Sequence, residues 1–471
     1  MRDLPLRAAR ALRLPALAVA TVAVAYLAWI GFDGVVSGYE RLRLPLLDDG
    51  TLGSRVLVIS PHPDDESLAA GGLVRQSLQQ HRRVMVAVVT CGDGFKRIVR
   101  RYASRDTTVS PYLRLGEARS GEARAASAKL GLPASDLVLL GYPDGSMTSL
   151  WSADWSVSRS GVNGCESVPY AFAYRPGAPY RGSSVASDLA SIIASFSPTA
   201  VVYPDAEDAN ADHWAVAAFT EYALDRAGFR GSRYTYLVHR GHFPFPWSFV
   251  PRGWLEPPRT LSRLGEGWLA YPLDSETERE KERALEEYVS QQRAMEPFLA
   301  AFVRRNELFQ SVSQPVPATS GDESSLDAAA MPGVVLRDPS ADTLLRSVDA
   351  GADLERVAFV QGPRICWIGV EARSPVTIGV TYRLSSRLIG EEGRGGRMDL
   401  EIRGRKAQEL RFGHDSVTLP SPPILRIKGK RVWVGIPSSV FAGDREAMIS
   451  AETCQGGMAL DRTAWRSVLL D

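Results

Sequence analysis

The stretch Arg55-Val56-Leu57-Val58-Ile59-Ser60 is followed at once by Pro61-His62-Pro63-Asp64-Asp65-Glu66. The first half is a short apolar run rich in β-branched residues, which is typical of a strand buried on both faces of a parallel sheet. The second half places one histidine and three acids directly after that strand. Ligand sites in α/β sheets lie beyond the carboxyl ends of the strands, so this stretch predicts both a fold class and the place of a site.

On the C-terminal side of this stretch, strand-like runs alternate with helix-like segments. The strand-like runs are 84–90, 137–140, 199–203 and 234–238, and the helix-like segments are 67–80, 117–130, 185–196 and 213–227. Such alternation indicates βαβ units. We therefore expect an α/β domain over residues 54–310, with a Rossmann-like, mostly parallel sheet and flanking helices. The charged segment 277–309 is expected to be a long helix with a solvated face.

The pattern changes after residue 310. Residues 311–330 are rich in Ser, Pro, Gly and acids and are predicted to be a linker. Residues 331–471 contain short alternating runs between turn residues, which predicts a C-terminal all-β, sandwich-like domain. If the chain is exported, Cys366 and Cys454 of this domain are the pair expected to form a disulfide.

The composition is that of an ordinary globular protein with several domains. The chain has 471 residues, of which 45% are hydrophobic and 23% charged, and this length exceeds one compact core. With a net charge of +1 and no long basic tract, we expect no nucleic-acid partner. None of the four cysteines stands in a C-x-x-C pair, which gives no support to a cysteine zinc site.

The N-terminus carries a membrane signal. Leu14 to Phe32 is a 19-residue stretch without a charged residue, just long enough for a helix to span a bilayer core of ~30 Å. Four arginines and one acid precede it, and the positive-inside rule then keeps the N-terminus in the cytoplasm. Residues 1–33 are predicted to be a single-pass anchor, residues 34–53 a linker, and the remaining domains extracytoplasmic. The alternatives are a cleaved signal peptide, which would give a secreted protein, and a buried core helix.

Two loops offer ligands for a metal ion. His62 and Asp65 are three residues apart on a tight loop and can reach one cation, and a catalytic zinc typically takes three protein ligands and leaves a fourth position for water. The loop that begins at Asp205 follows another buried strand and supplies His213. The two loops converge if their strands lie side by side. A hydrogen-bonded His-Asp pair, with Asp212 as a helix cap, is the alternative.

Several motifs together resemble the PIG-L/LmbE-like family of zinc-dependent N-acetylglucosaminyl de-N-acetylases. The run Pro61-His62-Pro63-Asp64-Asp65-Glu66 is similar to the family signature, and weaker similarities follow it in the family's order. These are Gly71-Gly72, Arg119-Ser120-Gly121-Glu122, Tyr142-Pro143-Asp144-Gly145 and Asp212-His213. The resemblance covers roughly residues 54–245.

The resemblance implies a role for each matching residue. The implied Zn²⁺ ligands are His62, Asp65 and His213. Asp64 would be the general base that activates a water for attack on an N-acetyl carbonyl, and the products would be acetate and a free amino sugar. Arg119 and Asp144 would lie near the sugar pocket, with a structural ion pair as their alternative role.

One position departs from the family pattern. The family's late motif reads His-Pro-Asp-His, and this chain has Asn210-Ala211-Asp212-His213 in its place. Asn210 can donate a hydrogen bond to an oxyanion, but it cannot give up a proton at neutral pH. The acid is then protonated Asp64 or another group, for which His239 and His242 are candidates. Exposed loop histidines without a catalytic role are the alternative.

Taken together, the sequence favours a zinc-dependent amidohydrolase that removes an N-acetyl group from an N-acetylglucosamine-type sugar of a glycan or glycolipid. One alternative is a non-catalytic glycan- or partner-binding protein that retains a metal loop, and Asn210 supports it. A metal phosphoesterase is a weaker alternative, because no Lys- or Arg-rich phosphate cradle accompanies the motif.

Overall fold

The structure is a computed structural model of the chain. It describes Thr21, Val24 and residues 44–102, 110–258, 261, 267–313, 315–340, 350–377, 379–390, 396–403, 406–412 and 422–471. The chain divides into two units, residues 1–46 and residues 47–471. All helices and strands named below belong to the second unit.

The predicted anchor, Leu14 to Phe32, lies outside the described residues except for Thr21 and Val24. Among the helices that the structure does describe, none is long and apolar enough to cross a membrane. The anchor, the signal peptide and the extracytoplasmic location therefore stay predictions.

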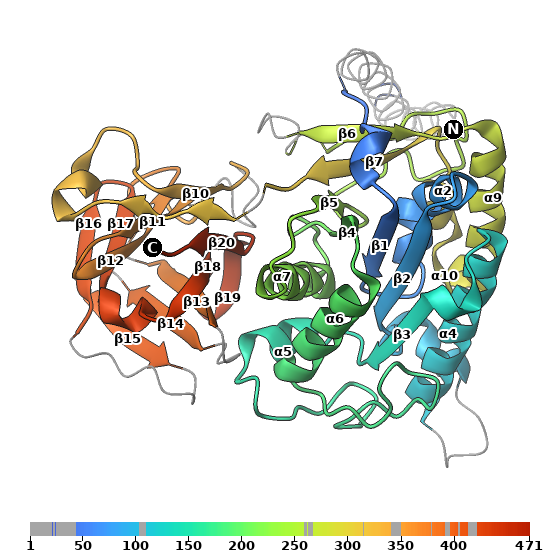
Figure 1. Cartoon of the computed structure of the whole chain (residues 1–471), viewed down its shortest axis with the longest axis horizontal. Coiled ribbons are helices and arrows are strands. Elements are labelled where there is room, and N and C mark those ends of the chain that lie inside the picture. The colour runs from blue at the N-terminus through green and yellow to red at the C-terminus, as the bar shows by residue number, and fades with distance from the viewer. Residues whose placement is uncertain are drawn as a thin grey trace, which may run out of the picture. The chain divides into compact units, whose positions relative to one another are not determined.

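The α/β domain is built on a sheet whose described strands have the order β3-β2-β1-β4-β5-β7-β6 (Figure 1). Neighbouring strands from β3 to β5 are parallel, whereas β7 is antiparallel to both β5 and β6. The strands are β1 (Arg55–Ser60), β2 (Arg83–Thr90), β3 (Leu137–Tyr142), β4 (Ala200–Pro204), β5 (Ser232–Tyr236), β6 (Trp268–Pro272) and β7 (Asn306–Ser311). The predicted mostly parallel sheet is confirmed.

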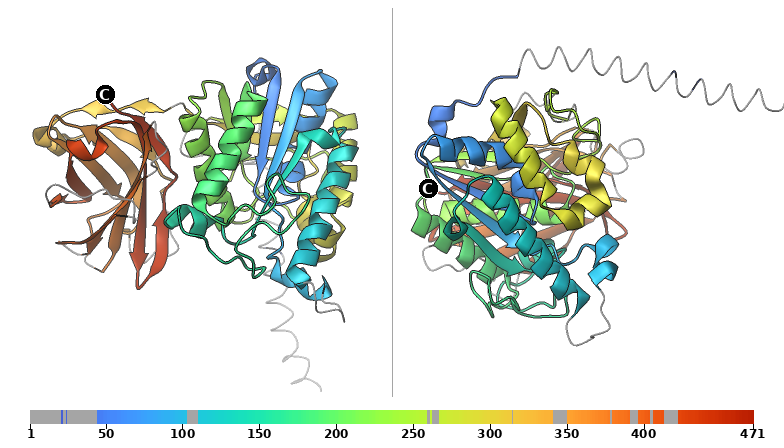
Figure 2. Two further views of the ribbon diagram at one scale, coloured as in Figure 1. Left: turned by 60° about the horizontal axis from the view of Figure 1, so that its bottom comes forward. Right: turned by 90° about the vertical axis from the view of Figure 1, so that its right-hand side faces the viewer.

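Helices cover both faces of this sheet (Figures 1 and 2). On one face lie α2 (Asp65–Gln79), α4 (Pro111–Lys129), α9 (Ser275–Glu286) and α10 (Val289–Ala300), and on the other lie α6 (Gly182–Phe196) and α7 (Ala211–Arg226). Two short helices, α3 (Lys96–Val99) and α5 (Met147–Ser152), follow β2 and β3. The sheet's core strands are apolar on both faces because helices bury them from either side.

β1 lies at the point where the strand order reverses. The chain passes from β1 to β2 on one side, and β4 later pairs with the opposite edge of β1. Val56 is in register with Val84 of β2 and with Ala200 of β4. Loops that leave β1 and β4 therefore start side by side, which is the usual ligand position in doubly wound sheets.

Two predicted segments differ from the structure. Residues 277–309 do not form one long helix: α9 and α10 are separate, and the segment ends in β7. Residues 306–309 are buried, because β7 lies between β5 and β6 in the sheet. This pairing joins residues that are far apart in the sequence, so the local pattern could not indicate it. The predicted linker at 311–330 holds short strands β8 (Val316–Pro317) and β9 (Thr319–Ser320), which pair with the C-terminal sheets.

The C-terminal region forms two β-sheets that share one apolar core, as the sandwich prediction expects. One sheet holds β9, β10 (Val334–Arg337), β11 (Leu354–Gln361), β12 (Ile365–Ala372), β16 (Ile424–Lys428) and β17 (Arg431–Pro437). The other holds β8, β13 (Thr381–Gly390), β14 (Arg397–Arg403), β15 (Lys406–Phe412), β18 (Asp444–Gln455), β19 (Met458–Arg462) and β20 (Arg466–Leu469).

The four cysteines are all free in the structure. Cys366 lies in β12 and Cys454 in β18, which belong to different sheets of the sandwich. The disulfide predicted between them is not formed.

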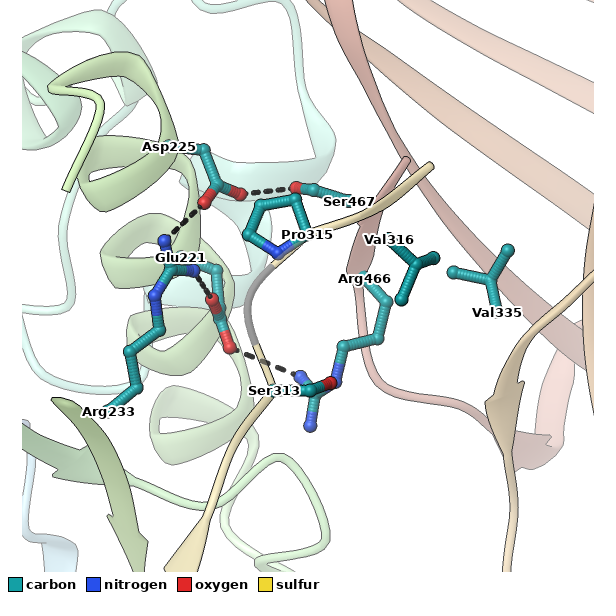
Figure 3. Close-up of a pocket in the computed structure, with 9 residues that line it drawn as sticks. All are labelled: Glu221, Asp225, Arg233, Ser313, Pro315, Val316, Val335, Arg466 and Ser467. Carbon is teal, nitrogen blue, oxygen red and sulfur yellow. Dashed lines mark hydrogen bonds and ion pairs between the residues drawn. The ribbon is translucent and has the colours of Figure 1, made fainter. Parts of the chain in front are cut away.

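The C-terminal sheet that holds β13, β18 and β20 packs against α7. Figure 3 shows the ionic contacts on this side of α7. Within the α/β domain, Arg233 of β5 lies 2.7 Å from both Glu221 and Asp225 of α7. Arg466 of β20 lies 3.3 Å from Glu221, and the hydroxyl of Ser467 donates to Asp225. Each buried carboxylate of α7 is thus paired with a cation or donor, as burial of charge requires.

A further buried acid, Glu446 of β18, adds pH dependence to this contact. Burial, followed by the charge of Asp225, raises the pKa of Glu446 to about 7, and its Oε2 has no hydrogen-bond partner among the described residues. The folded state therefore holds this proton more tightly than the unfolded chain, so stability falls as pH rises through about 7.

We expect Glu446→Gln to raise the melting temperature at pH 8.5, because the variant has no charge to bury, and to change it little at pH 5. Thermal unfolding at both pH values measures this. Glu286→Gln, at an exposed position of α9, is the control. An equal shift of Glu446→Gln at both pH values would contradict the titration.

Candidate metal centre

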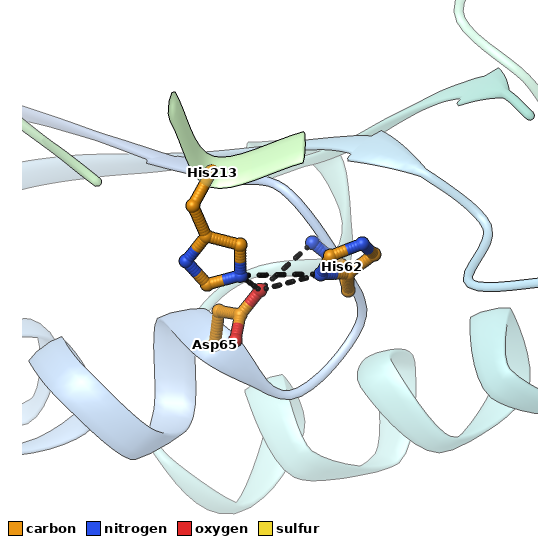
Figure 4. Close-up of side chains that lie close together, drawn as sticks. All are labelled: His62, Asp65 and His213. Carbon is orange, nitrogen blue, oxygen red and sulfur yellow. Dashed lines mark hydrogen bonds and ion pairs between the residues drawn. The ribbon is translucent and has the colours of Figure 1, made fainter. Parts of the chain in front are cut away.

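The three predicted ligands meet at the ends of β1 and β4 (Figure 4). Oδ2 of Asp65 lies 3.1 Å from Nδ1 of His62 and 3.0 Å from Nε2 of His213, and the two histidine nitrogens are 3.3 Å apart. His62 is on the loop after β1, while Asp65 and His213 are in the first turns of α2 and α7. All three side chains are buried.

The outer nitrogen of His213 faces a second carboxylate. Its Nδ1 lies 3.1 Å from Oδ2 of Asp208, and the same oxygen accepts hydrogen bonds from the backbone N–H groups of Val238 and His239, each at 2.9 Å. A carboxylate behind a histidine fixes the ring so that the other nitrogen points at a metal. Asp208 was not predicted as a site residue, and its place five residues before His213 in the same acidic loop was the only local signal.

His62 has a second set of acidic neighbours. Its Nε2 lies 3.3 Å from Oδ1 of Asp144 and 3.4 Å from Oδ2 of Asp212. Asp212 is held in place by the backbone N–H groups of Gly145 and Met147, at 2.6 and 3.0 Å. Asp144, expected near a sugar pocket, thus lies at the centre itself. His62, Asp144 and Asp212 also have ligand atoms close enough for one ion.

The donor set fits a divalent cation. Burial disfavours a charged His62, yet Asp144, Asp212 and Asp65 outweigh it and raise the pKa of His62 well above its ordinary value. Burial likewise opposes protonation of His213, and Asp208 with Asp65 raises its pKa to about 10. The surrounding carboxylates thus demand positive charge between the imidazoles, which a metal ion supplies while both rings stay neutral.

Asp64 has an unusual backbone. Its φ of 138° is in a region that side chains other than glycine rarely adopt, at a typical cost of about 1–3 kcal/mol, and such residues concentrate at functional sites. Glu66 holds the loop: its Oε2 accepts from the Asp64 N–H at 3.2 Å and from the Ser60 hydroxyl at 2.9 Å, and its Oε1 accepts from Tyr288. The strain at Asp64 is thus fixed by buried hydrogen bonds.

The side chain of Asp64 pairs with Arg119. Its Oδ1 lies 3.2 Å from Nη2 of Arg119, and burial raises the pKa of Asp64 to about 8 against the lowering effect of that guanidinium. Arg119 also donates to the carbonyls of Pro63 and Gly92, at 2.8 and 3.0 Å. Gly92 has φ +60°, and a Cβ there would meet Arg119 Nη1 at 2.0 Å. The ion pair expected as the alternative role of Arg119 is therefore with Asp64.

The remaining predicted residues differ in their surroundings. Asn210 is the N-cap of α7, with its Oδ1 accepting from the Asp212 N–H at 2.9 Å. His242 is exposed, and no described contact joins it to the centre. His239 is the nearer histidine: its ring lies 5.1 Å from that of His213 and stacks on Phe298 at 5.3 Å. Burial lowers the pKa of His239, so the ring is neutral near pH 7.

Comparison with known proteins agrees with this geometry. Residues 57–224 match the PIG-L family model, described as GlcNAc-PI de-N-acetylase. The resemblance predicted from the motifs is confirmed over these residues, and the match identifies the α/β domain as a deacetylase-type hydrolase that acts on amides. No curated protein matches the chain at a significant level.

Several solved structures are similar to part of this chain. The A40926 pseudoaglycone deacetylase Dbv21 is 19% identical, with 55% of this chain and 99% of that chain covered and a TM-score of 0.36. The N,N'-diacetylchitobiose deacetylase from Pyrococcus horikoshii is 19% identical, with 58% of this chain and 89% of that chain covered and a TM-score of 0.34. GalB, a 4-carboxy-2-hydroxymuconate hydratase from Pseudomonas putida, is 14% identical, with 56% of this chain and 99% of that chain covered and a TM-score of 0.36.

We expect Asp208→Asn to weaken metal binding by roughly 10–100-fold, the usual cost of losing a carboxylate behind a ligating histidine. Metal content after dialysis, and competition with a chromophoric chelator, measure the change. Glu207→Gln is the matched control, since Glu207 lies in the same loop but pairs with Arg240. Equal metal affinity of Asp208→Asn and wild type would show that Asp208 does not orient His213.

Proposed function

We propose that this protein is a Zn²⁺-dependent hydrolase that removes the N-acetyl group of an N-acetylglucosamine-type sugar. The observation that carries the proposal is the buried set His62, Asp65 and His213, next to Asp64, whose backbone is strained and whose carboxylate is not part of the set. This set lies in a domain of de-N-acetylase type. Two imidazole nitrogens and one carboxylate oxygen are a donor set typical of catalytic zinc. A bound Zn²⁺ would lower the pKa of a water and polarise the amide carbonyl.

Asp64 is the group best placed to move the proton. It stands between His62 and Asp65 in the sequence, and the charges of both act on its carboxyl group. Asp64 is in neither of the residue groups whose ligand atoms lie close enough for one ion. Burial raises its pKa, and a cation among the neighbouring ligands would bring it back down. A carboxyl whose pKa lies near the working pH can both accept the proton of the attacking water and return it to the leaving amine.

Asn210 is compatible with this division of roles. Its Oδ1 is engaged in the cap of α7, while its Nδ2 has no acceptor among the described residues. That amide N–H can stabilise the negative charge that develops on the carbonyl oxygen. Because Asn210 carries no proton to transfer, the acid is Asp64 in its protonated form.

Aromatic side chains near the centre suit a sugar substrate. Trp247 and Phe249, on the loop that follows β5, are about half exposed, at 53% and 50%. Trp247 contacts Phe298 at 5.6 Å, and Phe298 in turn stacks on His239. Exposed aromatic rings beside a site offer apolar surface with a polar edge, which suits the faces of a pyranose. If residues 1–33 anchor the chain, the acceptor is a glycolipid or envelope glycan at a membrane surface.

We expect Asp64→Asn to lower acetate release from N-acetylglucosamine-containing substrates by about 10²–10⁴-fold, as for loss of a general base, with metal content unchanged. Acetate is measured by a coupled assay, beside zinc analysis of the same samples. Metal binding without acetate from any of a broad substrate panel would instead support the non-catalytic glycan- or partner-binding protein. The absence of both would defeat the proposal.

The two candidate histidines can be separated by substitution. We expect His239→Ala to reduce turnover, because its ring packs against the ligand His213, and His242→Ala to leave turnover unchanged, because it lies exposed on the surface. The pH profile of kcat for each variant is the readout. A loss of activity only in His242→Ala would instead make His242 the proton donor.

A further inference from the structure

A polar cavity lies between the C-terminal sheet and helices α5 and α7, the second of which carries His213. Its volume is about 220 Å³. Thr148 of α5 and Trp214 of α7 line it from the α/β domain. From the β-rich domain it is lined by six charged side chains: Arg383, Arg397, Asp399, Glu401, Glu452 and Arg462.

The strand register creates this surface. Arg383 of β13 is paired with Glu401 of β14 on one side and Glu452 of β18 on the other, at 2.8 and 2.5 Å between charged atoms. Side chains alternate along a strand, so the neighbouring Tyr382 and Leu384 point into the sandwich core instead. The outward face of three adjacent strands is therefore a polar row.

Only one end of this row is covered. Arg387 of β13 packs its guanidinium 3.8 Å from the Trp155 ring and donates to the Trp151 carbonyl at 2.9 Å. Four residues earlier along the same strand, Arg383 lines the cavity. The cavity is thus the part of the contact where sheet and helices stand apart.

Arg462 and Trp465 have side-chain N–H groups at the cavity without a hydrogen-bond acceptor in the part of the chain that the structure describes. The guanidinium of Arg462 lies 3.9 Å from the Trp214 ring, and it has no carboxylate partner among the described residues. The indole of Trp465, which also lines the cavity, is only 3% exposed, and its Nε1 has no hydrogen-bond partner among those residues. A buried N–H without an acceptor costs stability, which a ligand oxygen would restore.

The charge balance indicates the kind of ligand. Three arginines face three carboxylates, so the lining carries no net charge and offers donors and acceptors in equal measure. Such a surface does not favour an anion or a cation. It suits a neutral, polyhydroxylated molecule, whose hydroxyls both donate and accept. The volume is below the ~300–1,000 Å³ of pockets for drug-sized ligands, so we infer that the cavity binds one neutral sugar unit of a larger glycan.

The cavity and the candidate metal centre share helix α7. Trp214 follows the ligand His213 on α7, and Thr148 donates to the Ala211 carbonyl at the start of the same helix, at 2.8 Å. The β-rich domain would thus hold a glycan beside the helices that position the ligands. That this glycan is also the substrate rests on the proposed function, whereas sugar binding in the cavity does not.

Binding is tested on the full chain stripped of metal, with N-acetylchitohexaose, maltohexaose and xylohexaose as probes and tryptophan fluorescence or calorimetry as readout. We expect at least one to bind saturably, and Arg462→Met to weaken it by about tenfold or more, as for a lost hydrogen bond to a charged group. Glu452→Gln provides a second cavity variant should Arg462→Met fail to fold. Arg445→Gln, an exposed position of β18, is the control.

His213→Ala separates the two proposals. We expect it to lose metal and acetate release but to bind the oligosaccharide as wild type does. No saturable binding of any probe, or equal binding by wild type and both cavity variants, would overturn the inference even if acetate release is observed. Cavity-dependent binding without acetate release would leave the inference standing and defeat the proposed function.

Discussion

The parallel pairing of β1 with β4 is the constraint on which the metal centre depends. It sets Val56 opposite Ala200 and so brings together two loops that lie about 150 residues apart in the chain. His62 comes from one loop, and Asp208, whose Oδ2 lies 3.1 Å from Nδ1 of His213, comes from the other. The loop after β1 supplies only His62 and Asp65, and the third candidate ligand, His213, follows β4. If another strand lay beside β1 on this side, His213 would lie elsewhere along the sheet edge.

Burial sets the chemistry of the residues that this pairing brings together. The centre is enclosed, so its carboxylates cannot be solvated and instead hold positive charge on the imidazoles or around a metal ion. The same burial raises the proton affinity of Asp64, while Arg119 keeps its carboxylate form accessible. The burial of these side chains therefore accounts both for the attraction of a cation and for the raised pKa of Asp64.

Much of this arrangement follows from local sequence. The buried strands, the helices after them and the ligands His62 and Asp65 are all determined by residues close to one another in the chain. His213 could be predicted only on the condition that β1 and β4 are neighbours. The contact of Tyr288 with Glu66 joins residues 222 positions apart, and the strands hidden in 306–320 pair with distant partners. Such features depend on tertiary pairing, for which a single sequence holds no local signal.

The burial of α7 has a consequence for how the two domains can exist. Every residue from Asp212 to Asp225 is buried. This is unusual for a helix on the outside of an α/β sheet, and the reason is that β13 and β20 of the C-terminal sheet pack on α7 together with α5 and α6. A fragment that ends before residue 331 would lack Thr463, Arg466 and Ser467, which contact Trp214, Glu221 and Asp225 of this helix. Of their ionic partners, the two acids would keep only Arg233. The C-terminal sheet is therefore part of the surroundings that bury α7, the helix that carries His213.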